Sequence, residues 1–347
     1  MTSHLGFFMQ LAACAGYWYF HAMGLLYGVP GVLVKNRTVY LELALERKTM
    51  KYGIIGLGKM GQSIAYRAHA HNLNITGYDP DQEARDNTQN IGIEIATSIS
   101  EIAQKTDIIW LMVPAGPTVD TVIKELLLYI KPGTIIIDGG NSKFTDSVER
   151  SQKLKQKNIF YLDCGTSGGL NGREIGFCCM IGGEKQAYEK TIPFFKAISA
   201  PDGFVYMGPA GSGHYVKMVH NGIEYALMQA YAQGFDLLKH GHFKNLNLAD
   251  IAHVWQHGSV IRSWLLDLCS EILHEDQNLK NISGSVNHTG MGAWTVEEAE
   301  KQHISVSLIK DALDIRKDSQ KTGGNFATKL VAMLRNKFGG HQVTQLK

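Results

Sequence analysis

Short apolar runs alternate with longer stretches of helical character between Met50 and about Pro209. Each run is short enough for a strand and is bounded by Gly, Pro, Asn or Asp, which interrupt regular structure. The five expected strands are Lys51–Gly56, Asn74–Tyr78, Ile108–Val113, Thr134–Asp138 and Phe160–Asp163. Because strands that alternate with helices form βαβ units, this region predicts a doubly wound, mostly parallel sheet.

The strand pattern stops after Gly211. One long helix is expected from Tyr215 to about Leu238, and the stretches 248–274, 294–319 and 325–337 also have helical character. We therefore expect an α/β Rossmann domain over residues 50–210, an all-α domain over 211–334 and a C-terminal tail over 335–347.

The segment before Met50 differs from the rest of the chain. From Leu5 to Val34 it contains no Lys, Arg, Asp or Glu, and a run of this length could span a bilayer. Interspersed Gly, Pro and His dilute its apolar character, and no basic residue precedes it as a signal peptide requires. Two hypotheses follow: residues 1–49 lie upstream of the true start, or they form a membrane anchor. No membrane association is expected for residues 50–347.

Composition indicates an ordinary globular protein and argues against several other classes. The chain is 44% hydrophobic and 19% charged, which argues against disorder. A net charge of +2, without a Lys/Arg run, argues against a nucleic-acid partner. The five cysteines lack zinc-type spacing, and no ligand cluster indicates a metal site. Adjacent Cys178 and Cys179 are expected to be buried as small apolar residues, and this cysteine usage fits a reducing cytoplasm.

A glycine-rich turn, Gly56-Leu57-Gly58-Lys59-Met60-Gly61, follows the first expected strand and opens a helix. In this setting Gly56 permits the tight turn, Gly58 the approach of a pyrophosphate, and Gly61 close packing of helix on sheet. The amide groups at the helix N-terminus attract the phosphate charge. We therefore expect this turn to bind a dinucleotide.

An acidic residue ends the second expected strand. Asp79 lies 79 − 56 = 23 residues after Gly56, where a carboxylate accepts hydrogen bonds from the ribose hydroxyls and repels a 2′-phosphate. NADP sites usually supply an Arg instead, and the nearby candidate is Arg85. The sequence therefore predicts NAD as the cofactor, with NADP as the alternative.

Polar residues form a stripe on the first helix of the second domain. Lys217, His220, Asn221, Glu224 and Tyr225 lie at i, i+3, i+4, i+7 and i+8, which is one face of a helix. A buried ion pair would explain Lys217 and Glu224, but two helical turns separate them by about 10 Å. We favour a general base and a general acid on either side of a bound substrate.

The segment Gly208–Tyr225, which contains this stripe, closely resembles the signature of the 6-phosphogluconate dehydrogenases. The resemblance extends from Met50 to the C-terminus, and the chain is similar to the short form of the family because it lacks a long C-terminal helical repeat. It implies oxidative decarboxylation of 6-phosphogluconate to ribulose 5-phosphate and CO2, with reduction of NAD or NADP. Lys217 then matches the general base on the C3 hydroxyl, and Glu224 matches the acid that protonates C1 of the enediol.

The same resemblance implies further contacts. The expected substrate ligands are Asn141, Ser167, Gly168, Gly169, His220, Asn221, Tyr225, Arg316, Arg335 and His341. The loop Ser167–Gly169 would hold the carboxylate end of the substrate, while Tyr225, Arg316 and Arg335 would contact its phosphate. Asn141 would lie between nicotinamide and substrate, with Met60 beside the nicotinamide and Val113, Pro114 and Ala115 along the adenosine side.

The tail from Arg335 to His341 matches a family element that reaches the neighbouring subunit's site. The resemblance therefore implies a homodimer or homotetramer whose monomer lacks a complete site. One position departs from the family, because Ala293 stands where a lysine contacts the substrate phosphate. Loss of one cation from such a site weakens binding by about 1 kcal/mol or more.

Two alternatives remain open at this point. Another β-hydroxyacid dehydrogenase, such as a 3-hydroxyisobutyrate type, shares the Rossmann start and a Lys-x-x-x-Asn pair like Lys217 and Asn221. Such enzymes generally lack counterparts of His220, Glu224 and Tyr225. A catalytically silent dinucleotide sensor is the second alternative, and retention of both Lys217 and Glu224 argues against it.

Overall fold

The computed structural model describes residues 50–287 and 290–346. The two hypotheses about residues 1–49 therefore lie outside the described residues. Within these ranges, no helix combines the length and the apolar character that crossing a membrane requires.

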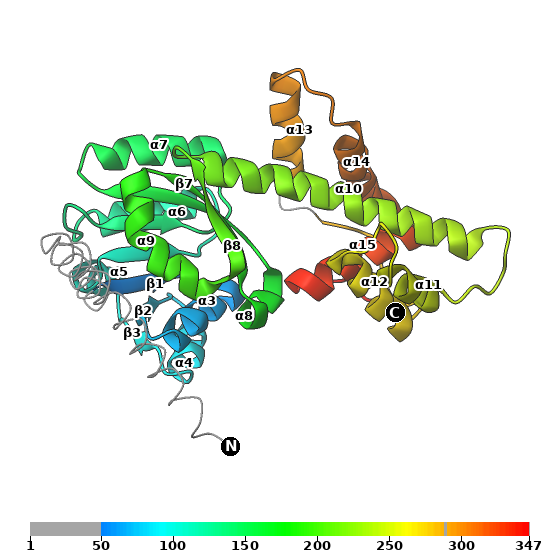
Figure 1. Ribbon diagram of the computed structural model, residues 1–347, viewed down its shortest axis with the longest axis horizontal. Coiled ribbons are helices and arrows are strands. Elements are labelled where there is room, and N and C mark those ends of the chain that lie inside the picture. Colours follow the sequence, from blue (N-terminus) through cyan, green and yellow to red (C-terminus); the bar gives the residue numbers. More distant parts are fainter. Residues whose placement is uncertain (1–49, 288–289, 347) are drawn as a thin grey trace, which may run out of the picture. The chain divides into compact units, whose positions relative to one another are not determined.

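Eight strands form one sheet in the order β3-β2-β1-β4-β5-β6-β7-β8 (Figure 1). Strand β7 runs antiparallel to β6, and the other neighbouring pairs are parallel. The doubly wound, mostly parallel sheet predicted from the sequence is thereby confirmed. The strands are β1 (Lys51–Ile55), β2 (Asn74–Tyr78), β3 (Glu94–Ile95), β4 (Ile108–Leu111), β5 (Ile135–Asp138), β6 (Phe160–Ser167), β7 (Phe177–Gly183) and β8 (Ser199–Gly208).

Three of these strands, β3, β7 and β8, are absent from the sequence-based expectation. β3 has only two residues. β8 contains Pro201 and Gly203, which normally interrupt a strand, and its pairing with β7 has register shifts. Its position at the edge of the sheet tolerates both features, because an edge strand needs only one row of ladder hydrogen bonds.

Helices cover both faces of the sheet (Figure 1). On one face, side chains of α5, α6 and α7 pack with β1, β4 and β5 into one apolar cluster. On the other face, Phe194 and Phe195 of α9 pack on Trp110, and Phe194 also stacks on Tyr52. The helices of this region are α3 (Lys59–Ala70), α4 (Gln82–Gln89), α5 (Ile99–Lys105), α6 (Pro117–Leu126), α7 (Phe144–Lys155), α8 (Gly172–Ile175) and α9 (Lys185–Ile198), with a 3-10 turn η1 (Gly169–Asn171).

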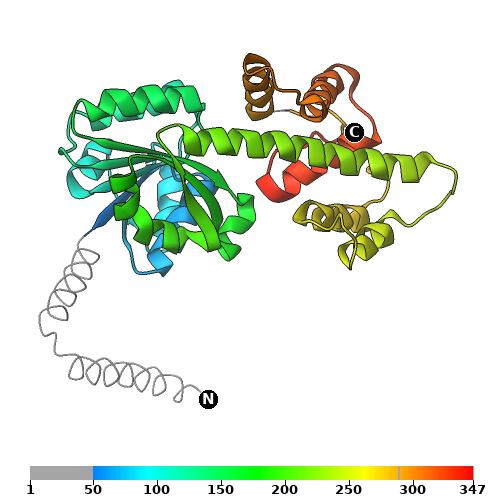
Figure 2. The same ribbon diagram turned by 45° about the horizontal axis from the view of Figure 1, so that its top comes forward.

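One long helix, α10 (Ser212–His240), follows the sheet and joins it to the remaining helices (Figures 1 and 2). Its first turns contact β6 and β7, and further along it contacts α13, α14 and α15. Side chains from α10 and the helices after it form a second apolar core. The later helices are α11 (Leu248–Gln256), α12 (Trp264–Glu275), α13 (Met291–Lys301), α14 (Ser307–Thr322) and α15 (Phe326–Gly339).

Two stretches expected as continuous helices are each divided in two. The stretch 248–274 is interrupted between α11 and α12, where Gly258 has φ of +96°. The stretch 294–319 is interrupted between α13 and α14, where His303 has φ of +57°. A residue in the left-handed conformation cannot continue a right-handed helix. The helix therefore ends near this residue, whatever the hydrophobic period of the sequence.

Cys178 is exposed, which corrects the expectation that it and Cys179 are both buried. Both lie on β7, where successive side chains point to opposite faces of the sheet. Cys179 is buried, and Cys178 pairs in register with Ser167 of β6 on the opposite face.

Candidate active site

The turn between β1 and α3 has the backbone that its glycine pattern predicts. Gly56 has φ of +97°, a conformation that strains other residues. A Cβ atom at Gly56 would lie 2.3 Å from the carbonyl oxygen of Met112, and one at Gly61 would lie 1.9 Å from that of Gly56. Nothing lies within 4 Å of a Cβ built at Gly58, so the N-terminus of α3 is open to a ligand.

Asp79 faces this turn from the end of β2. Its Oδ2 accepts a hydrogen bond of 2.7 Å from the backbone N–H of Leu57. Arg85 donates to the backbone oxygens of Asp79 and Pro80, at 2.5 and 2.9 Å, and this fixes its guanidinium against the main chain. The carboxylate of Asp79 thus lies next to the glycine-rich turn.

These residues fit a bound dinucleotide. No side chain caps α3, whose N-cap is Gly58, so backbone amides remain to bind a pyrophosphate. Lys59 is exposed and Met60 is half-buried at the start of the same helix. The loop that contains Val113, Pro114 and Ala115 follows β4, the neighbour of β1 in the sheet.

Asp163, a buried residue of β6, anchors the N-terminus of α10. Its two carboxylate oxygens accept hydrogen bonds from the backbone N–H groups of Gly211 at 2.6 Å and His214 at 2.8 Å. A carboxylate at a helix N-terminus also interacts favourably with the helix dipole. This contact fixes the position of α10 on the sheet, and with it the position of Lys217.

Lys217 lies close against β6. A Cβ atom at Gly165 would lie 2.3 Å from Cβ of Lys217, so only glycine allows this approach. Lys217 is 4% exposed. Burial lowers its pKa below the ordinary value, although the charge of Glu224 opposes this shift. A lysine held in this way can lose its proton and act as a base.

His220, the next residue of the stripe, lies close to both Asn221 and Glu224. Nδ1 of His220 lies 3.0 Å from Oδ1 of Asn221 and 3.8 Å from Oε2 of Glu224. Burial, followed by the charge of Lys217, lowers the pKa of His220. Both effects favour the neutral imidazole, so His220 can orient a substrate hydroxyl without adding charge.

Arg316 of α14 lies over the ring of Tyr225, with its guanidinium carbon 3.3 Å from the ring centroid. It is completely buried, and its three side-chain nitrogens form no hydrogen bond of ordinary geometry with any described residue. Burial lowers its pKa to about 10. A buried guanidinium without a partner is costly, and an anion would supply the missing acceptors.

Arg335 and His341 lie near Arg316. Arg335 is 7% exposed, and burial lowers its pKa despite the opposing effects of Tyr225 and Glu224. Burial, followed by the charges of Arg335 and Arg316, lowers the pKa of His341 to about 4. Two arginines thus share one buried region, which suits a dianion such as a phosphate.

The C-terminal tail approaches the loop after β6 and the glycine-rich turn of its own chain. The expectation that it is shared with a neighbouring subunit stays a prediction. Helix α15 packs against α10 and α12, and its C-terminal end contacts η1. A Cβ atom at Gly169 would lie 1.9 Å from the carbonyl oxygen of Phe338. A Cβ atom at Gly340 would lie 3.0 Å from Nζ of Lys59. One chain therefore brings the tail, the loop after β6 and the glycine-rich turn together.

The tail is held at its far end by main-chain pairing. Gln345 forms an antiparallel bridge with Ile282, and the N–H of Ser283 donates to the oxygen of Thr344 at 2.9 Å. Asn336 donates to the carbonyl oxygen of His341 at 2.9 Å. These contacts fix the backbone on both sides of His341.

Asn141 follows β5 with φ of +56°. Its side-chain amide donates to the oxygen of Thr166 at 3.1 Å, and its Oδ1 accepts from the N–H of Thr166 at 2.9 Å. Asn141 therefore holds the end of β6, directly before the loop Ser167–Gly169. Ala293 packs half-buried against the helical core and supplies no cation.

Sequence reasoning assigned no role to several polar residues beside the site. Asp138 and Asp163 are fully buried at neighbouring strand positions, and Arg150 of α7 is 5% exposed. Arg67 of α3 donates to the carbonyl oxygens of Ile198, Arg173 and Glu174, at 3.0, 3.2 and 3.1 Å. Asp138 could have been identified from the sequence, because it is a carboxylate at the carboxyl end of an expected parallel strand. Ligand sites of α/β sheets lie at that edge.

The fold and the site together define a class of protein. A Rossmann sheet with an open dinucleotide turn is followed by a helix that carries a buried lysine, and an unpartnered arginine lies beyond it. This arrangement is that of a dinucleotide-dependent dehydrogenase acting on an anionic substrate.

Comparisons with known proteins agree with this class. Residues 51–210 match the family of the NAD binding domain of 6-phosphogluconate dehydrogenase. Residues 213–345 match the family of the 6-phosphogluconate dehydrogenase C-terminal domain. An NAD(+)-dependent, decarboxylating 6-phosphogluconate dehydrogenase from Haloferax volcanii is 42% identical over 301 residues, which cover 85% of this chain and 99% of the relative.

Two solved structures are also similar. A Plasmodium falciparum 6-phosphogluconate dehydrogenase has a TM-score of 0.73 and 31% identity, over 78% of this chain and 62% of that chain. A 3-hydroxyisobutyrate dehydrogenase from Salmonella typhimurium has a TM-score of 0.69 over 81% of this chain and 99% of that chain, but its 20% identity shows a shared fold alone. The chain belongs to the 6-phosphogluconate dehydrogenase family, in its short form.

Proposed function

We propose that this protein is an NAD-dependent 6-phosphogluconate dehydrogenase that oxidises and decarboxylates its substrate to ribulose 5-phosphate and CO2. One observation carries the proposal: buried Lys217 and half-buried Glu224 lie on one helix beside the unpartnered guanidinium of Arg316. Such a site suits a substrate that offers a hydroxyl to the base and a phosphate to the anion site. The acid would deliver its proton after the substrate carboxylate has left as CO2. Family membership at 42% identity with an NAD(+)-dependent relative supports the same activity.

The turn Gly56–Gly61 would hold the cofactor, with Asp79 at the ribose and Val113, Pro114 and Ala115 along the adenosine side. NAD, when bound, accepts a hydride from C3 of the substrate. Asp79 favours NAD because its carboxylate accepts from ribose hydroxyls and repels a 2′-phosphate. Asn141 and Met60 would border the nicotinamide.

Lys217 and Glu224 perform the proton transfers. Neutral Lys217 takes the proton of the C3 hydroxyl as C3 is oxidised, and burial favours the neutral form by lowering its pKa. The resulting 3-keto acid loses CO2 because its carbonyl accepts the electrons of the broken bond. Protonated Lys217 stabilises the enolate, and Glu224 delivers a proton to C1 of the resulting enediol, which was C2 of the substrate.

The remaining substrate contacts follow from the same orientation. Arg316, Arg335 and Tyr225 bind the phosphate, with His341 beside them. Ser167, Gly168 and Gly169 hold the carboxylate end, and His220 and Asn221 bind hydroxyl groups. Residues 50–210 thus serve the dinucleotide, and residues 211–334 with the tail 335–347 serve most of the substrate.

Two properties of the whole protein are part of the proposal. Large apolar side chains remain exposed on α10, among them Ile223, Leu227 and Leu237, and they support a homo-oligomer. The four cysteines of the described ranges are free, which suits a reducing cytoplasm. Sedimentation analysis of the purified protein tests the first property.

Release of CO2 and formation of NADH from 6-phosphogluconate test the central proposal. Gluconate and 3-hydroxyisobutyrate are the control substrates, because neither carries a phosphate for the two arginines. We expect turnover with 6-phosphogluconate and NAD that exceeds turnover with either control. NADH formation without CO2, or preference for 3-hydroxyisobutyrate, would contradict the proposal.

A further inference from the structure

Asp138 is the centre of a buried polar network beside the site. It ends β5, is completely buried, and accepts hydrogen bonds on both carboxylate oxygens. Oδ1 accepts from the N–H of Gly140 at 3.1 Å. Oδ2 accepts from Oγ of Ser142 at 2.7 Å and from the hydroxyl of Tyr161 at 2.9 Å.

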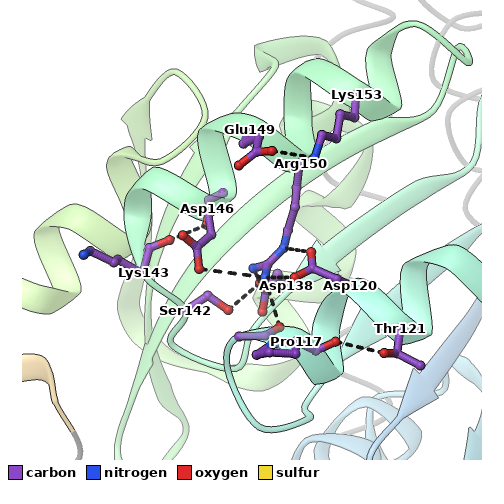
Figure 3. A network of polar contacts seen from close by, with 12 residues as sticks. Pro117, Asp120, Thr121, Asp138, Ser142, Lys143, Asp146, Glu149, Arg150 and Lys153 are labelled. Atoms are coloured by element: carbon purple, nitrogen blue, oxygen red, sulfur yellow. Dashed lines mark hydrogen bonds and ion pairs between the residues drawn. The ribbon is translucent and has the colours of Figure 1, made fainter.

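Arg150 joins this carboxylate to a second one (Figure 3). Its Nη1 lies 3.4 Å from Oδ2 of Asp138, while Nε and Nη2 bind the two oxygens of Asp120 at 2.7 and 3.0 Å. Nη2 also donates to the carbonyl oxygen of Gly116 at 3.1 Å. A planar guanidinium can satisfy these acceptors in one fixed geometry, which an ammonium group cannot.

The network binds two loops of the proposed cofactor site. The loop 113–116 would border the adenosine side, and the loop after β5, which carries Asn141, would border the nicotinamide. Gly116 ends the loop that contains Val113, Pro114 and Ala115, and Arg150 holds it from α7. The loop after β5 lies directly beside it, since a Cβ atom at Gly140 would lie 2.5 Å from the oxygen of Val113. One ion pair therefore fixes both loops relative to each other.

The bonds of Asp138 also surround Asn141. Gly140 and Ser142, its two neighbours, both donate to Asp138, so the main chain at Asn141 is held from both sides. Asn141 has φ of +56°, which costs energy for a residue with a side chain. Its amide in turn holds Thr166 before the loop Ser167–Gly169. A continuous series of contacts therefore connects Arg150, through Asp138 and Asn141, to the start of the loop Ser167–Gly169.

A buried ion pair is weak evidence for stability, because much of its attraction is offset by the loss of hydration. The position of this pair suggests a different role. We propose that Asp138 and Arg150 are positioning residues that set the hydride-transfer distance by fixing the loops 113–116 and 139–142 in one arrangement. This inference rests on the proposed dehydrogenase function, and neither residue touches the reacting atoms.

Asp138→Asn tests the inference, because it keeps the size of the side chain and removes its charge. The matched control is Glu149→Gln, on the same helix as Arg150, which removes the partner of Lys153 in an exposed ion pair. The measurement is the rate of NADH formation in a single turnover, divided by the number of sites that bind NAD. The primary isotope effect with substrate deuterated at C3 is measured alongside.

We expect Asp138→Asn to lower the rate per NAD-binding site by about 10- to 100-fold, as misplacement of reacting groups by an ångström does. The isotope effect should change with it, and Glu149→Gln should behave as the unaltered protein. A purely structural role would reduce the number of sites and the melting temperature, but would leave the rate per site and the isotope effect unchanged. That result would overturn the inference.

Asp120→Asn is the second variant, for the case that Asp138→Asn does not fold. The side chain of Asp120 is 61% exposed, so this change should spare the fold while weakening the hold of Arg150 on the 113–116 loop. We expect a loss of several-fold in the rate per site, and an unchanged rate would overturn the inference. Absence of activity in the unaltered protein would instead refute the proposed function, which is a separate outcome.

Discussion

The guanidinium carbon of Arg316 lies over the ring of Tyr225, 3.3 Å from its centroid, and its three side-chain nitrogens form no hydrogen bond of ordinary geometry with the described residues. Stacking on an aromatic ring keeps the group in place while its N–H donors remain available. If Arg316 binds the substrate phosphate, as we propose, the protein carries the cost of desolvating this charge before the ligand arrives. The site would then be preorganised at the expense of stability.

Replacement of Arg316 by Met separates these two effects. We expect the free energy of unfolding to rise by ~1–4 kcal/mol, because an unpaired buried charge is replaced by an apolar chain of similar length. We expect KM for 6-phosphogluconate to rise by about 10- to 100-fold, since charged hydrogen bonds are lost. Chemical denaturation and steady-state kinetics measure both, with exposed Arg262 changed to Met as the control. A lower stability together with an unchanged KM would contradict this account.

Lys217→Met should abolish turnover while leaving NAD binding intact, because the base is lost and the glycine-rich turn is untouched. Lys217→Arg is the matched variant, since it keeps a cation that does not lose its proton near neutral pH. We expect both variants to lose turnover by about a hundredfold or more. Substantial activity in Lys217→Arg would show that the site needs a positive charge there and not a base.

The same lysine predicts a pH dependence. Burial lowers its pKa below the ordinary 10.5, and only the neutral amine accepts the C3 proton. The value of kcat/KM should therefore rise with pH until it passes this lowered pKa, and then level off. A profile of kcat/KM against pH measures the step, and a rise that continues to 10.5 would argue against a buried lysine as the base.

His341 predicts a pH dependence of stability. Its pKa is about 4 in the folded protein and 6.5 ordinarily, so the unfolded chain gains a proton first as the pH falls. The stabilisation is complete above pH 6.5 and is lost as the pH falls toward 4. His341→Gln should make the fall in melting temperature over this range less steep, whereas the same change at exposed His274 should not. Equal slopes for both variants would contradict the lowered pKa.

Asp79→Asn should shift cofactor preference. The amide oxygen can still accept from the N–H of Leu57, but the negative charge that repels a 2′-phosphate is gone. We expect the ratio of kcat/KM for NADP to that for NAD to rise by about tenfold. Asp81→Asn, at the neighbouring helix cap, is the control, and an unchanged ratio in Asp79→Asn would show that another residue sets the preference.

Local patterns predicted the parts of the fold that depend on local sequence. The glycine-rich turn, four of the five expected strands to within two residues, and the polar face of α10 all follow from short-range periodicity. The edge strand β8, with its Pro201, and the turns that divide the later helices did not. Those features are decided by what packs beside them, and periodicity in one segment carries no such information.

The same division applies to the site. The spacing of Lys217 and Glu224 is a local property of one helix, and it indicates an acid and a base from the sequence alone. By contrast, the short contacts of Arg150 are not local, because Asp120 and Asp138 lie 30 and 12 residues away. Its local ion pair, with Asp146 at 3.9 Å, has the ordinary spacing of an exposed helix and does not mark a site. Whether the tail reaches its own site or another depends on how α15 packs against α10 and α12.

One continuous helix carries both the proton acceptor and the proton donor. Lys217 and Glu224 are seven residues apart on α10, about 10 Å along its axis, and no motion of loops or tail alters that spacing. If these residues perform the two proton transfers, as we propose, the helix itself sets the distance between the base and the acid.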